Sequence, residues 1–412
     1  MRKIELLVPA GSLEVLKVAV DYGADAVYIG GEAFGLRAKA HNFTLEDMKE
    51  AVAYCHDREV KLYVTANIFA HNDDLNGVRA YFEKIKPIGI DALIISDPAI
   101  FAIAKEVVPD IDIHISTQAN NTNYGTYQFW HKLGAARVVC ARELSLREIK
   151  EIRANIPEDM EIESFVHGAM CISYSGRCLL SHFLTGRDAN RGACTHPCRW
   201  KYSVVEETRP NEYFPVEEDD RGTYIFNSKD LCMVHHVPEL VEAGIDSFKI
   251  EGRMKTALYV ATVARTYRKA IDDYMKSPEL YASNLEWYKE EIGKCTYRQF
   301  TTGFYFGKTD SDSQVYDNND YMKEYTYIGK VESVDDDGRI CFMQRNKFLV
   351  GERIEAMLFD GSNVELEVCG IWNADMEAVE SAPHPKEALV VQVNRVLPVG
   401  TILRRKEVKG SA

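Results

Sequence analysis

The sequence lacks a long hydrophobic run and is poor in positive charge. No stretch of about eighteen apolar residues is present, which excludes a membrane-spanning helix of ordinary length. The start, MRKIELLVPAGS, has an apolar run too short for a signal peptide, so we expect a cytoplasmic protein that does not bind membranes. The formal net charge is −14, from 49 Lys and Arg against 63 Asp and Glu, so any contact with RNA requires a local basic patch.

Familiar catalytic and metal-binding motifs are missing as well. The chain has neither a G-x-S-x-G elbow nor an H-E-x-x-H pair, which argues against the common serine and zinc peptidases. Its cysteines do not follow the two-residue gaps of zinc ribbons or bacterial ferredoxins. Ten cysteines without an export signal argue against a disulfide framework, and we expect metal ligands, nucleophiles or core residues instead.

Short β-branched runs alternate with amphipathic segments along the first two thirds of the chain. The eight predicted strands are IELLVPA, DAVYIGG, VKLYVTANI, DALIISD, DIHISTQAN, ARVVCAR, MEIESFVHG and IDSFKIEGR. Eight strand and helix units in roughly 275 residues match an α/β fold of the (β/α)8, or TIM-like barrel, type. A doubly wound open sheet is the alternative. We favour the barrel because the predicted strands end in polar residues, and the carboxyl ends of barrel strands carry the active site.

The pattern divides the chain into parts. We expect a TIM-like catalytic domain over 1–303, in which a cysteine-rich insertion at about 171–230 follows strand seven. A linker, 304–323, leads to a small antiparallel β-barrel over 324–412, where short alternating strands are separated by DG and GS turns. Long insertions in compact domains are usually functional or disordered, and the cysteine content of this one favours function.

Five cysteines gather in and just after the insertion. They are Cys171, Cys178, Cys194, Cys198 and Cys232. Four thiolates suit either a structural zinc ion or an iron-sulfur cluster, and spacing alone does not separate the two. Because the first cysteine follows strand seven and the last leads into the next helix, a metal bound there would lie over the mouth of the barrel. This position favours a functional site over a structural zinc ion or a set of unrelated reduced thiols.

The segment ESFVHGAMCISYSGRCLLS, residues 163–181, fits the pattern E-x-F-x-x-G-A-M-C-x-x-x-x-G-x-C-x-L-S. Together with LLVPAGS, DAVYIGG, HISTQANNTN, RGACTHPCRW, NSKDLC and FKIEGRMK, it resembles the collagenase-like peptidases of unknown catalytic type. The resemblance implies hydroxylation of RNA or of the ubiquinone ring rather than ordinary proteolysis, with a 4Fe-4S cluster held by four cysteines. The matching positions give Cys171, Cys178, Cys194 and Cys232 as the metal ligands, with Cys198 as the alternative to Cys194.

Length and domain layout resemble the tRNA-hydroxylating branch of that family. The resemblance implies formation of 5-hydroxyuridine at the wobble position of tRNA, with prephenate as co-substrate. One alternative is a hydroxylase acting on another RNA or on an aromatic quinone precursor. Another is a collagenase-like cysteine peptidase with His167 or His196 as base, although four or five clustered thiols exceed what one nucleophile requires. A non-enzymatic RNA-binding role is the remaining alternative.

Polar residues at the strand ends provide the predicted substrate and catalytic sites. Prephenate carries two carboxylates, which call for cationic partners. The predicted substrate-binding residues are Arg37, Asn67, Gln118, Asn120, Arg142, Lys249 and Arg253. Pairing with Glu32, Glu143 or Glu251 is the alternative role of the cations. Glu163 and His167 are the predicted catalytic residues, through proton transfer or hydrogen bonding, and their even spacing places both on one side of a regular strand.

A local basic patch lies within the acidic chain. The predicted RNA-binding residues are Arg177, Arg187, Arg191, Arg199 and Lys201, against a single acid, Asp188. Such a patch binds phosphates, and a wobble uridine in the tRNA anticodon loop is already single-stranded. The alternative role of these residues is to brace the cysteine loop. A homo-oligomer or a pair with a paralogue is compatible with the sequence.

Overall fold

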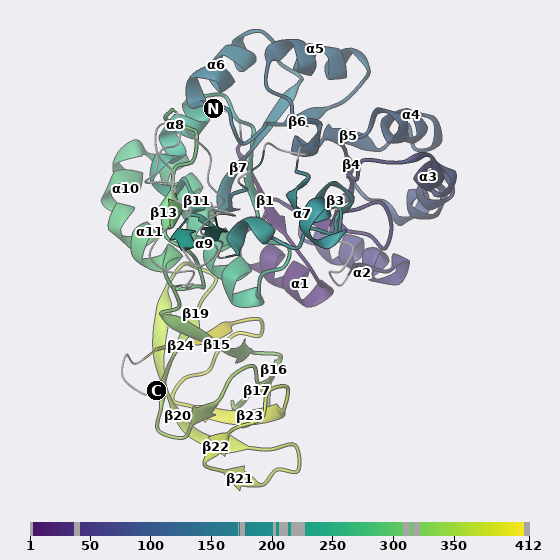
Figure 1. Ribbon diagram of the computed structural model, residues 1–412. Coiled ribbons are helices and arrows are strands. Elements are labelled where there is room, and N and C mark those ends of the chain that lie inside the picture. The colour runs from purple at the N-terminus through teal and green to yellow at the C-terminus, as the bar shows by residue number, and fades with distance from the viewer. Residues whose placement is uncertain are drawn as a thin grey trace. The chain divides into compact units, whose positions relative to one another are not determined.

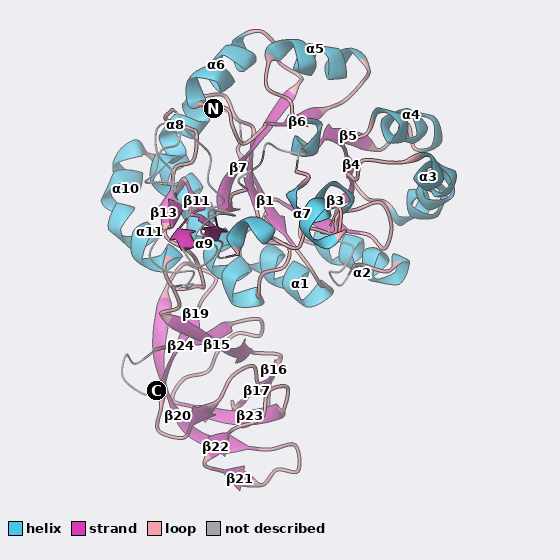
Figure 2. Cartoon of the chain, viewed as in Figure 1, coloured by secondary structure: helices cyan, strands magenta, loops and turns pink. Residues whose placement is uncertain are grey.

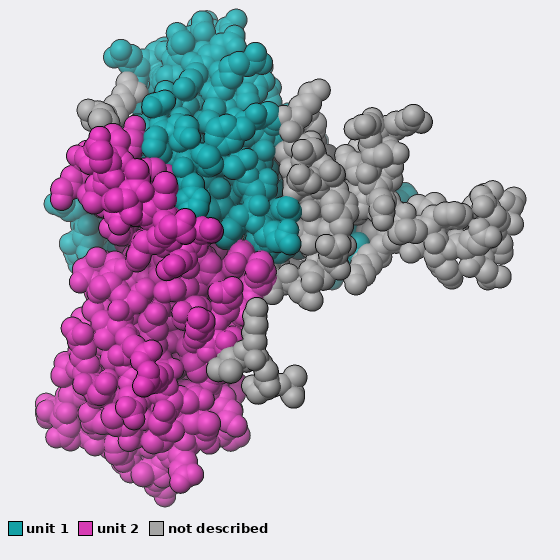
Figure 3. Space-filling model, turned by 90° about the vertical axis from the view of Figure 1, so that its left-hand side faces the viewer, with its two compact units in different colours: residues 1–20, 24–255, 298–320 teal, residues 21–23, 256–297, 321–412 magenta. Residues whose placement is uncertain are grey.

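The computed structural model describes most of the chain, which divides into two compact units (Figure 3). The described residues are 3–36, 42–171, 173, 178–200, 203–205, 213–215, 227–307, 314–315 and 322–407; of 199, 203–205, 213–215, 227–228 and 314–315 only the backbone is described. The first unit comprises 1–20, 24–255 and 298–320, and the second comprises 21–23, 256–297 and 321–412. The helices that follow the last barrel strand in the chain therefore group with the C-terminal residues.

Eight parallel strands of the first unit close into a barrel (Figure 1). They are β1 (Glu5–Pro9), β2 (Ala26–Gly30), β3 (Lys61–Ala66), β4 (Ala92–Ile95), β5 (Asp112–Ile115), β6 (Arg137–Val139), β7 (Glu161–Ala169) and β12 (Ser247–Ile250). The strands from β1 to β7 pair in sequence order, and β12 pairs with both β7 and β1, which closes the circle. Each coincides with one of the eight predicted runs, so the predicted (β/α)8 architecture is confirmed.

Helices alternate with these strands along the chain (Figure 2). They are α1 (Leu13–Asp21), α2 (Leu45–His56), α3 (Asn72–Ile85), η1 (Lys86–Ile88), α4 (Pro98–Val107), η2 (Thr117–Ala119), α5 (Tyr124–Lys132), α6 (Leu146–Ala154), η5 (Val234–His236) and α8 (Val237–Glu242). Thr44 and Asp47 form a capping box at the start of α2. Ser145 and Glu148 form another at the start of α6. These caps satisfy backbone N–H groups that have no partner within the helix.

The inside of the barrel differs from strand to strand. Strands β1 to β4 contribute an apolar cluster of Leu7, Ala26, Tyr28, Tyr63, Ala92 and Ile94. Strands β5, β6, β7 and β12 contribute His114, Arg137, Glu163 and Lys249, all of them buried. Charged side chains inside a protein require charged or hydrogen-bonding partners, so this part of the barrel is expected to contain an ion network.

Strand β7 has a second partner beyond the barrel. β11 (Asp230–Cys232) pairs with it in the antiparallel direction, and β13 (Phe300–Thr301) lies parallel to β11 (Figure 1). The first unit also contains α7 (Leu180–Thr185), η3 (Ala189–Arg191), η4 (Pro197–Arg199), β8 (Ser203–Val205), β9 (Tyr213–Pro215), β10 (Asn227–Ser228) and β14 (Gln314–Val315). The two ends of the cysteine-rich insertion are thus joined by the same β7 and β11 pairing.

The backbone of β7 is irregular where it leaves the barrel. Its pairing with β12 shifts by one residue between Phe165 and His167, which is a β-bulge. Gly168 follows with a φ of 112°, and a Cβ there would lie 2.4 Å from the carbonyl oxygen of Glu251. Only glycine tolerates both the positive φ and this close approach.

The second unit joins three helices to an antiparallel sheet. Its helices are α9 (Ala257–Lys276), α10 (Pro278–Ser283) and α11 (Leu285–Ile292). Its strands are β15 (Tyr325–Lys330), β16 (Ser333–Val334), β17 (Ile340–Met343), β18 (Phe348–Leu349), β19 (Arg353–Met357), β20 (Asn363–Trp372), β21 (Ala378–Val379), β22 (Ser381–Ala382), β23 (Ala388–Val393) and β24 (Ile402–Lys406). The main sheet has the order β15-β24-β19-β20-β23-β17-β16, so the predicted antiparallel C-terminal architecture is confirmed.

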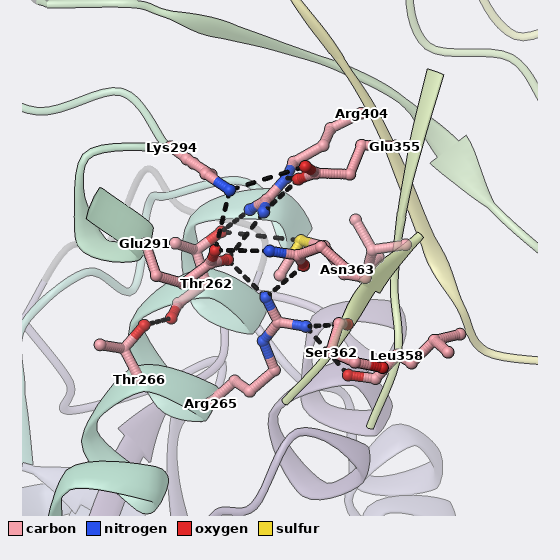
Figure 4. Close-up of polar contacts among 12 residues, drawn as sticks. Thr262, Arg265, Thr266, Glu291, Lys294, Glu355, Leu358, Ser362, Asn363 and Arg404 are labelled. Atoms are coloured by element: carbon pink, nitrogen blue, oxygen red, sulfur yellow. Dashed lines mark hydrogen bonds and ion pairs between the residues drawn. The ribbon is translucent and has the colours of Figure 1, made fainter. Parts of the chain in front are cut away.

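A buried ion network connects the helices of the second unit to its sheet (Figure 4). The Arg404 side chain, 0% exposed, has nitrogen-oxygen distances of 2.8 Å to Glu291 and 2.5 Å to Glu355. Arg265 lies 2.5 Å from Glu291, and Lys294 lies within 4 Å of both carboxylates, at 3.3 and 3.6 Å. We call Arg265, Glu291, Lys294, Glu355 and Arg404 the unit-2 network. Because its members come from α9, α11, β19 and β24 or the turns beside them, it holds these elements together.

None of the helices in the described parts of the chain combines the length and the apolar character that crossing a membrane requires.

Candidate functional site

The clustered cysteines begin where β7 leaves the barrel. Cys171 follows the end of β7 by two residues, and Cys232 is the last residue of β11, where it pairs with His167. The side chains of Cys171 and Cys194 are exposed, whereas those of Cys178, Cys198 and Cys232 are partly buried. Cys171 and Cys232 therefore lie at the carboxyl end of the barrel, which is the end that carries active sites in this fold.

Hydrogen bonds fold the cysteine segment back on itself. The Asn190 side chain accepts a bond from the backbone N–H of Cys178 (3.4 Å) and donates one to its carbonyl (3.0 Å). The Ser181 hydroxyl accepts a bond from the backbone N–H of Thr195 (3.0 Å), the neighbour of Cys194. These bonds place 178–181 beside 190–195, which brings Cys178 and Cys194 to the same part of the segment.

The thiols of Cys178 and Cys194 lie close enough to Cys171 to affect its pKa. Desolvation raises the pKa of Cys171, a backbone hydrogen bond at Ser173 and the Arg142 guanidinium oppose the rise, and the thiols of Cys178 and Cys194 add to it. We call Cys171, Cys178 and Cys194 the mouth thiols. A set of soft sulfur donors suits zinc or an iron-sulfur cluster, so the donor chemistry fits the expected metal. Within the described residues, no three Cys, His, Asp or Glu side chains stand at the spacing of a bound metal ion.

Glu163, predicted to be catalytic, lies at the centre of an ion network inside the barrel. Its carboxylate oxygens are 2.6 Å from the Lys249 Nζ and 3.0 Å from an Arg137 guanidinium nitrogen. Arg137 also contacts Glu5 at 2.5 Å. We call Glu5, Arg137, Glu163 and Lys249 the barrel network. Cations inside the barrel therefore contact both oxygens of Glu163. One of these cations is Lys249, which was predicted to bind the substrate.

The surroundings of Glu5 and of the neighbouring His114 keep each group in one protonation state near neutral pH. Burial raises the pKa of Glu5, but the Arg137 guanidinium beside it outweighs burial and the net shift is downward. Burial, together with the positive charges of Arg137 and Lys249, holds the pKa of His114 well below its usual range. The carboxylate therefore stays ionised and the imidazole stays neutral near neutral pH.

His167, the second predicted catalytic residue, has neighbours different from those of Glu163. Its ring centroid lies 5.6 Å from that of Phe300 on β13. Burial lowers the pKa of His167 to about 3, although Asp230 opposes the shift. A neutral imidazole of this kind is a weak base near pH 7 but can still hold a hydrogen bond. The β-bulge before His167 ends the regular alternation on which the shared side was predicted, so the structure does not bring the two residues together.

Arg142 lines a narrow pocket at the ends of β6 and β7, together with Ser164, Phe165 and Tyr305. It donates a hydrogen bond to the carbonyl oxygen of Ala169 (3.0 Å). Its guanidinium also lies 3.5 Å from Glu251, the pairing expected as its alternative role. Arg142 is thus placed between the barrel mouth and the start of the cysteine segment.

The predicted ligands Arg253 and Asn67 are engaged by the barrel rim. Arg253 donates hydrogen bonds to the Thr65 hydroxyl (3.2 Å) and to the carbonyl of Leu36. Asn67 donates to Ser116 (3.1 Å) and accepts from the backbone N–H of Leu36 (3.3 Å). Both side chains therefore fix the loop after β2.

Gln118 and Asn120 lie on and just after the η2 turn that follows β5, and both are partly buried. Asn120 adopts a left-handed φ of 54°, and its Oδ1 is buried without a hydrogen-bond partner among the described atoms. A buried acceptor of this kind is suited to a donor group on a ligand or to an ordered water. Arg37 lies outside the described residues.

The predicted RNA-binding residues divide into two groups. Arg187 is exposed just after α7, near Phe183, whose side chain is 83% exposed. Arg191 is also exposed, but its guanidinium pairs with Asp74 on α3 at 2.8 Å, which fits the bracing role. Arg177, Lys201 and the side chain of Arg199 lie outside the described residues.

Two family models match the chain. Peptidase family U32 matches residues 11–315, and the Peptidase family U32 C-terminal domain matches residues 323–404. The chain belongs to peptidase family U32. Bacillus subtilis tRNA hydroxylation protein P1 is 40% identical over 98% of this chain and 95% of its own length. Escherichia coli tRNA hydroxylation protein P is 38% identical over 93% and 92%, and a Porphyromonas gingivalis protein named collagenase is 34% identical over 79% and 79%.

Sequence reasoning missed two parts of this U32 site. Arg137 and Glu5 complete the barrel network, and the signal available for Arg137 was a charged residue among apolar neighbours in AARVVC. Tyr305, assigned to a linker, donates to the carbonyl oxygen of Phe165 (2.6 Å) and shares a hydrogen bond with Ser164 (2.7 Å). No local pattern marks such a contact, because its partners are 140 residues away in the chain.

Proposed function

We propose that this U32 protein hydroxylates tRNA, forming 5-hydroxyuridine at the wobble position with prephenate as co-substrate. The main support is the similarity over nearly the whole chain to proteins named for tRNA hydroxylation. The site adds a group of thiols at the carboxyl end of a TIM-like barrel. These thiols are more numerous than a peptidase nucleophile requires.

The cofactor in this proposal is a 4Fe-4S cluster held by Cys171, Cys178, Cys194 and Cys232. Interaction among the mouth thiols supports the first three, and the pairing of Cys232 with His167 on β7 supports the fourth. Such a cluster supplies electron transfer beside the barrel mouth, because four thiolate ligands occupy its irons. The neutral His167 imidazole is suited to hydrogen bonding next to Cys232, and not to proton abstraction near pH 7.

The substrates would meet at the same end of the barrel. Arg142 and Arg253 supply cations for the prephenate carboxylates, and the buried Oδ1 of Asn120 supplies an acceptor. Arg187, exposed beside Phe183, is suited to a phosphate of the anticodon loop, and the phenyl ring to an unstacked base. Lys249 and Glu163 lie inside the barrel and support the residues at its mouth, and in this proposal they do not contact the substrates.

Nucleoside mass spectrometry tests the reaction. In cells that lack the gene, tRNA 5-hydroxyuridine should fall, and the wild-type gene should restore it while a Cys171→Ala copy should not. An unchanged nucleoside profile in the deletion strain would reject the tRNA assignment. Restoration by added prephenate in a strain unable to make it would support the co-substrate.

Metal analysis tests the cofactor. Protein purified without oxygen should contain about four iron and four sulfide per chain. Cys171→Ala and Cys232→Ala should lose most of this iron, whereas Cys369→Ala, an exposed cysteine of the C-terminal sheet, should keep it. Stoichiometric zinc in colourless wild-type protein would reject the iron-sulfur assignment.

Peptidase activity is the second candidate, because one relative is named a collagenase. Incubation with gelatin should show no cleavage beyond that of the Cys171→Ala variant. Cleavage by wild type that is lost in this variant would restore the peptidase assignment.

A further inference from the structure

Arg142 is held in one place by three different contacts. Its guanidinium lies 4.0 Å from the Phe165 ring centroid, which is the distance of a cation-π contact. One terminal nitrogen donates to the carbonyl oxygen of Ala169 at 3.0 Å, and the other lies 3.5 Å from Glu251. The side chain is only 16% exposed, so these contacts are little weakened by water.

The ring beneath Arg142 is itself supported by the barrel network. The Lys249 Nζ lies 5.6 Å from the Phe165 centroid and 4.4 Å from that of Tyr28, and it is fixed by Glu163 at 2.6 Å. The carbonyl of Phe165 accepts a hydrogen bond from Tyr305 (2.6 Å). Phe165 therefore presents a fixed surface on which the Arg142 guanidinium rests.

These contacts place a positive charge beside the cysteines. Ala169, whose carbonyl Arg142 binds, precedes Cys171 by two residues at the end of β7. Among the described strand-end cations, Arg142 is thus bound directly to the backbone that leads into the cysteine segment.

We propose that Arg142 is a positioning residue for the mouth thiols: it fixes the end of β7 from which the cysteine segment departs, and its charge stabilises the metal-bound thiolates. This role rests on the proposed function in so far as the bound group is an iron-sulfur cluster. A positive charge beside such a cluster favours its more negative, reduced state. Loss of an outer partner of a metal site typically weakens metal binding by about 10- to 100-fold.

Arg153 provides a matched control for this residue. Its side chain is 17% exposed, pairs with Asp246 at 3.3 Å and donates to the carbonyl oxygen of Met160 at 2.9 Å. Asp246 and Met160 directly precede β12 and β7, so Arg153 lies at the amino end of the barrel, away from the cysteines. Arg142 and Arg153 share burial, charge and type of partner, but Arg142 follows β6 at the carboxyl end of the barrel, whereas Arg153 lies on α6 and contacts the residues that precede β7 and β12.

The experiment compares Arg142→Gln, Arg142→Lys and Arg153→Gln in full-length protein purified without oxygen. The midpoint potential is followed by electron paramagnetic resonance, and iron release to a chelator is timed. Arg142→Gln should shift the potential to a more negative value and release iron about tenfold faster. Arg142→Lys should recover the potential, because the charge remains, but not the slow release, because the planar stacking contact is lost.

The outcomes separate this role from the proposed function. If wild type holds the cluster and Arg142→Gln matches Arg153→Gln in potential and in release rate, the positioning role is wrong. If the lysine variant behaves like the glutamine variant in potential, the charge is not what Arg142 contributes. If wild type contains no iron, the cofactor assignment itself fails, and this role of Arg142 fails with it.

Discussion

The barrel network and the unit-2 network are both buried, but they differ in the origin of their members. Glu5, Arg137, Glu163 and Lys249 lie on strands β1, β6, β7 and β12, which are neighbours in the barrel sheet, and their two positive and two negative charges balance. In the unit-2 network, helices α9 and α11 meet strands of a sheet far along the chain, and three cations face two carboxylates.

Because of this difference, the barrel network supports the candidate site, whereas the unit-2 network supports the fold of the second unit. The barrel network ends at Lys249 and Phe165, beneath Arg142 and the mouth thiols, so disturbing it changes the site as well as stability. The unit-2 network joins residues 256–297 to the C-terminal sheet, so disturbing it should loosen the second unit as a whole.

The largest effect is expected for Arg404→Met. Removing this side chain takes the fully buried cation from between Glu291 and Glu355, and breaking a buried ion network in this way costs about 3–5 kcal/mol. Urea denaturation of the full-length protein measures the loss. A cost under about 1 kcal/mol would mean that the network behaves like an exposed ion pair and that the two networks do not differ as described.

Acid should weaken the unit-2 network through Glu291. Burial raises the pKa of Glu291, but Arg265, Arg404 and Lys294 outweigh it and lower the pKa to about 2. Because the folded pKa lies below the ordinary 4.5, this stabilisation is complete above about pH 4.5 and is lost as pH falls towards 2. The loss amounts to about 3 kcal/mol. Urea denaturation at several pH values should show this slope in wild type and a flatter slope in Glu291→Gln.

Glu163→Gln should have a smaller effect on stability but a visible one at the site. The amide keeps a hydrogen-bond acceptor but removes the charge opposite Lys249, which we expect to cost about 2 kcal/mol. With Lys249 less firmly held, Phe165 and Arg142 should also loosen, so iron release should quicken. Glu161→Gln is the matched control, since Glu161 pairs with the same Arg137 but is 45% exposed. Equal costs for the two variants would contradict the central place of Glu163.

The smallest effect is expected for Arg353→Met. This residue pairs with Glu365 at 2.8 Å on the surface of the same sheet that carries Arg404, but both partners are mostly exposed. Exposed pairs contribute about 0–1 kcal/mol, so the midpoint of denaturation should scarcely move. A loss comparable to that of Arg404→Met would show that burial does not set the difference between the two arginines.

Local sequence patterns were sufficient to predict the barrel and the antiparallel C-terminal sheet. The barrel strands are short apolar runs, and several are followed by a helix with a recognisable start, such as the capping box of Thr44 and Asp47. The position of Cys171 just after β7 followed from the same pattern. Periodicity carries this information because it depends only on neighbours in the chain.

Contacts between distant residues were not accessible in this way. The even spacing of Glu163 and His167 predicted a shared side, but a β-bulge set by pairing with β12 intervenes. For Lys249 and Arg142 the sequence left open whether each binds a ligand or pairs with an acid, and the structure pairs them with Glu163 and Glu251. Which partner a charged side chain finds depends on register and packing, which no local sequence pattern determines.

The pairing of Ala169 with Asp230 has a consequence for the length that the cysteine segment can have. The segment 170–229 connects two strands that pair with each other, because both of its ends are fixed in one antiparallel ladder. The entropic cost of closing a loop grows only by about 0.6 kcal/mol for each doubling of its length. A change in the length of this segment is therefore expected to alter the free energy of unfolding of the barrel by less than about 1 kcal/mol.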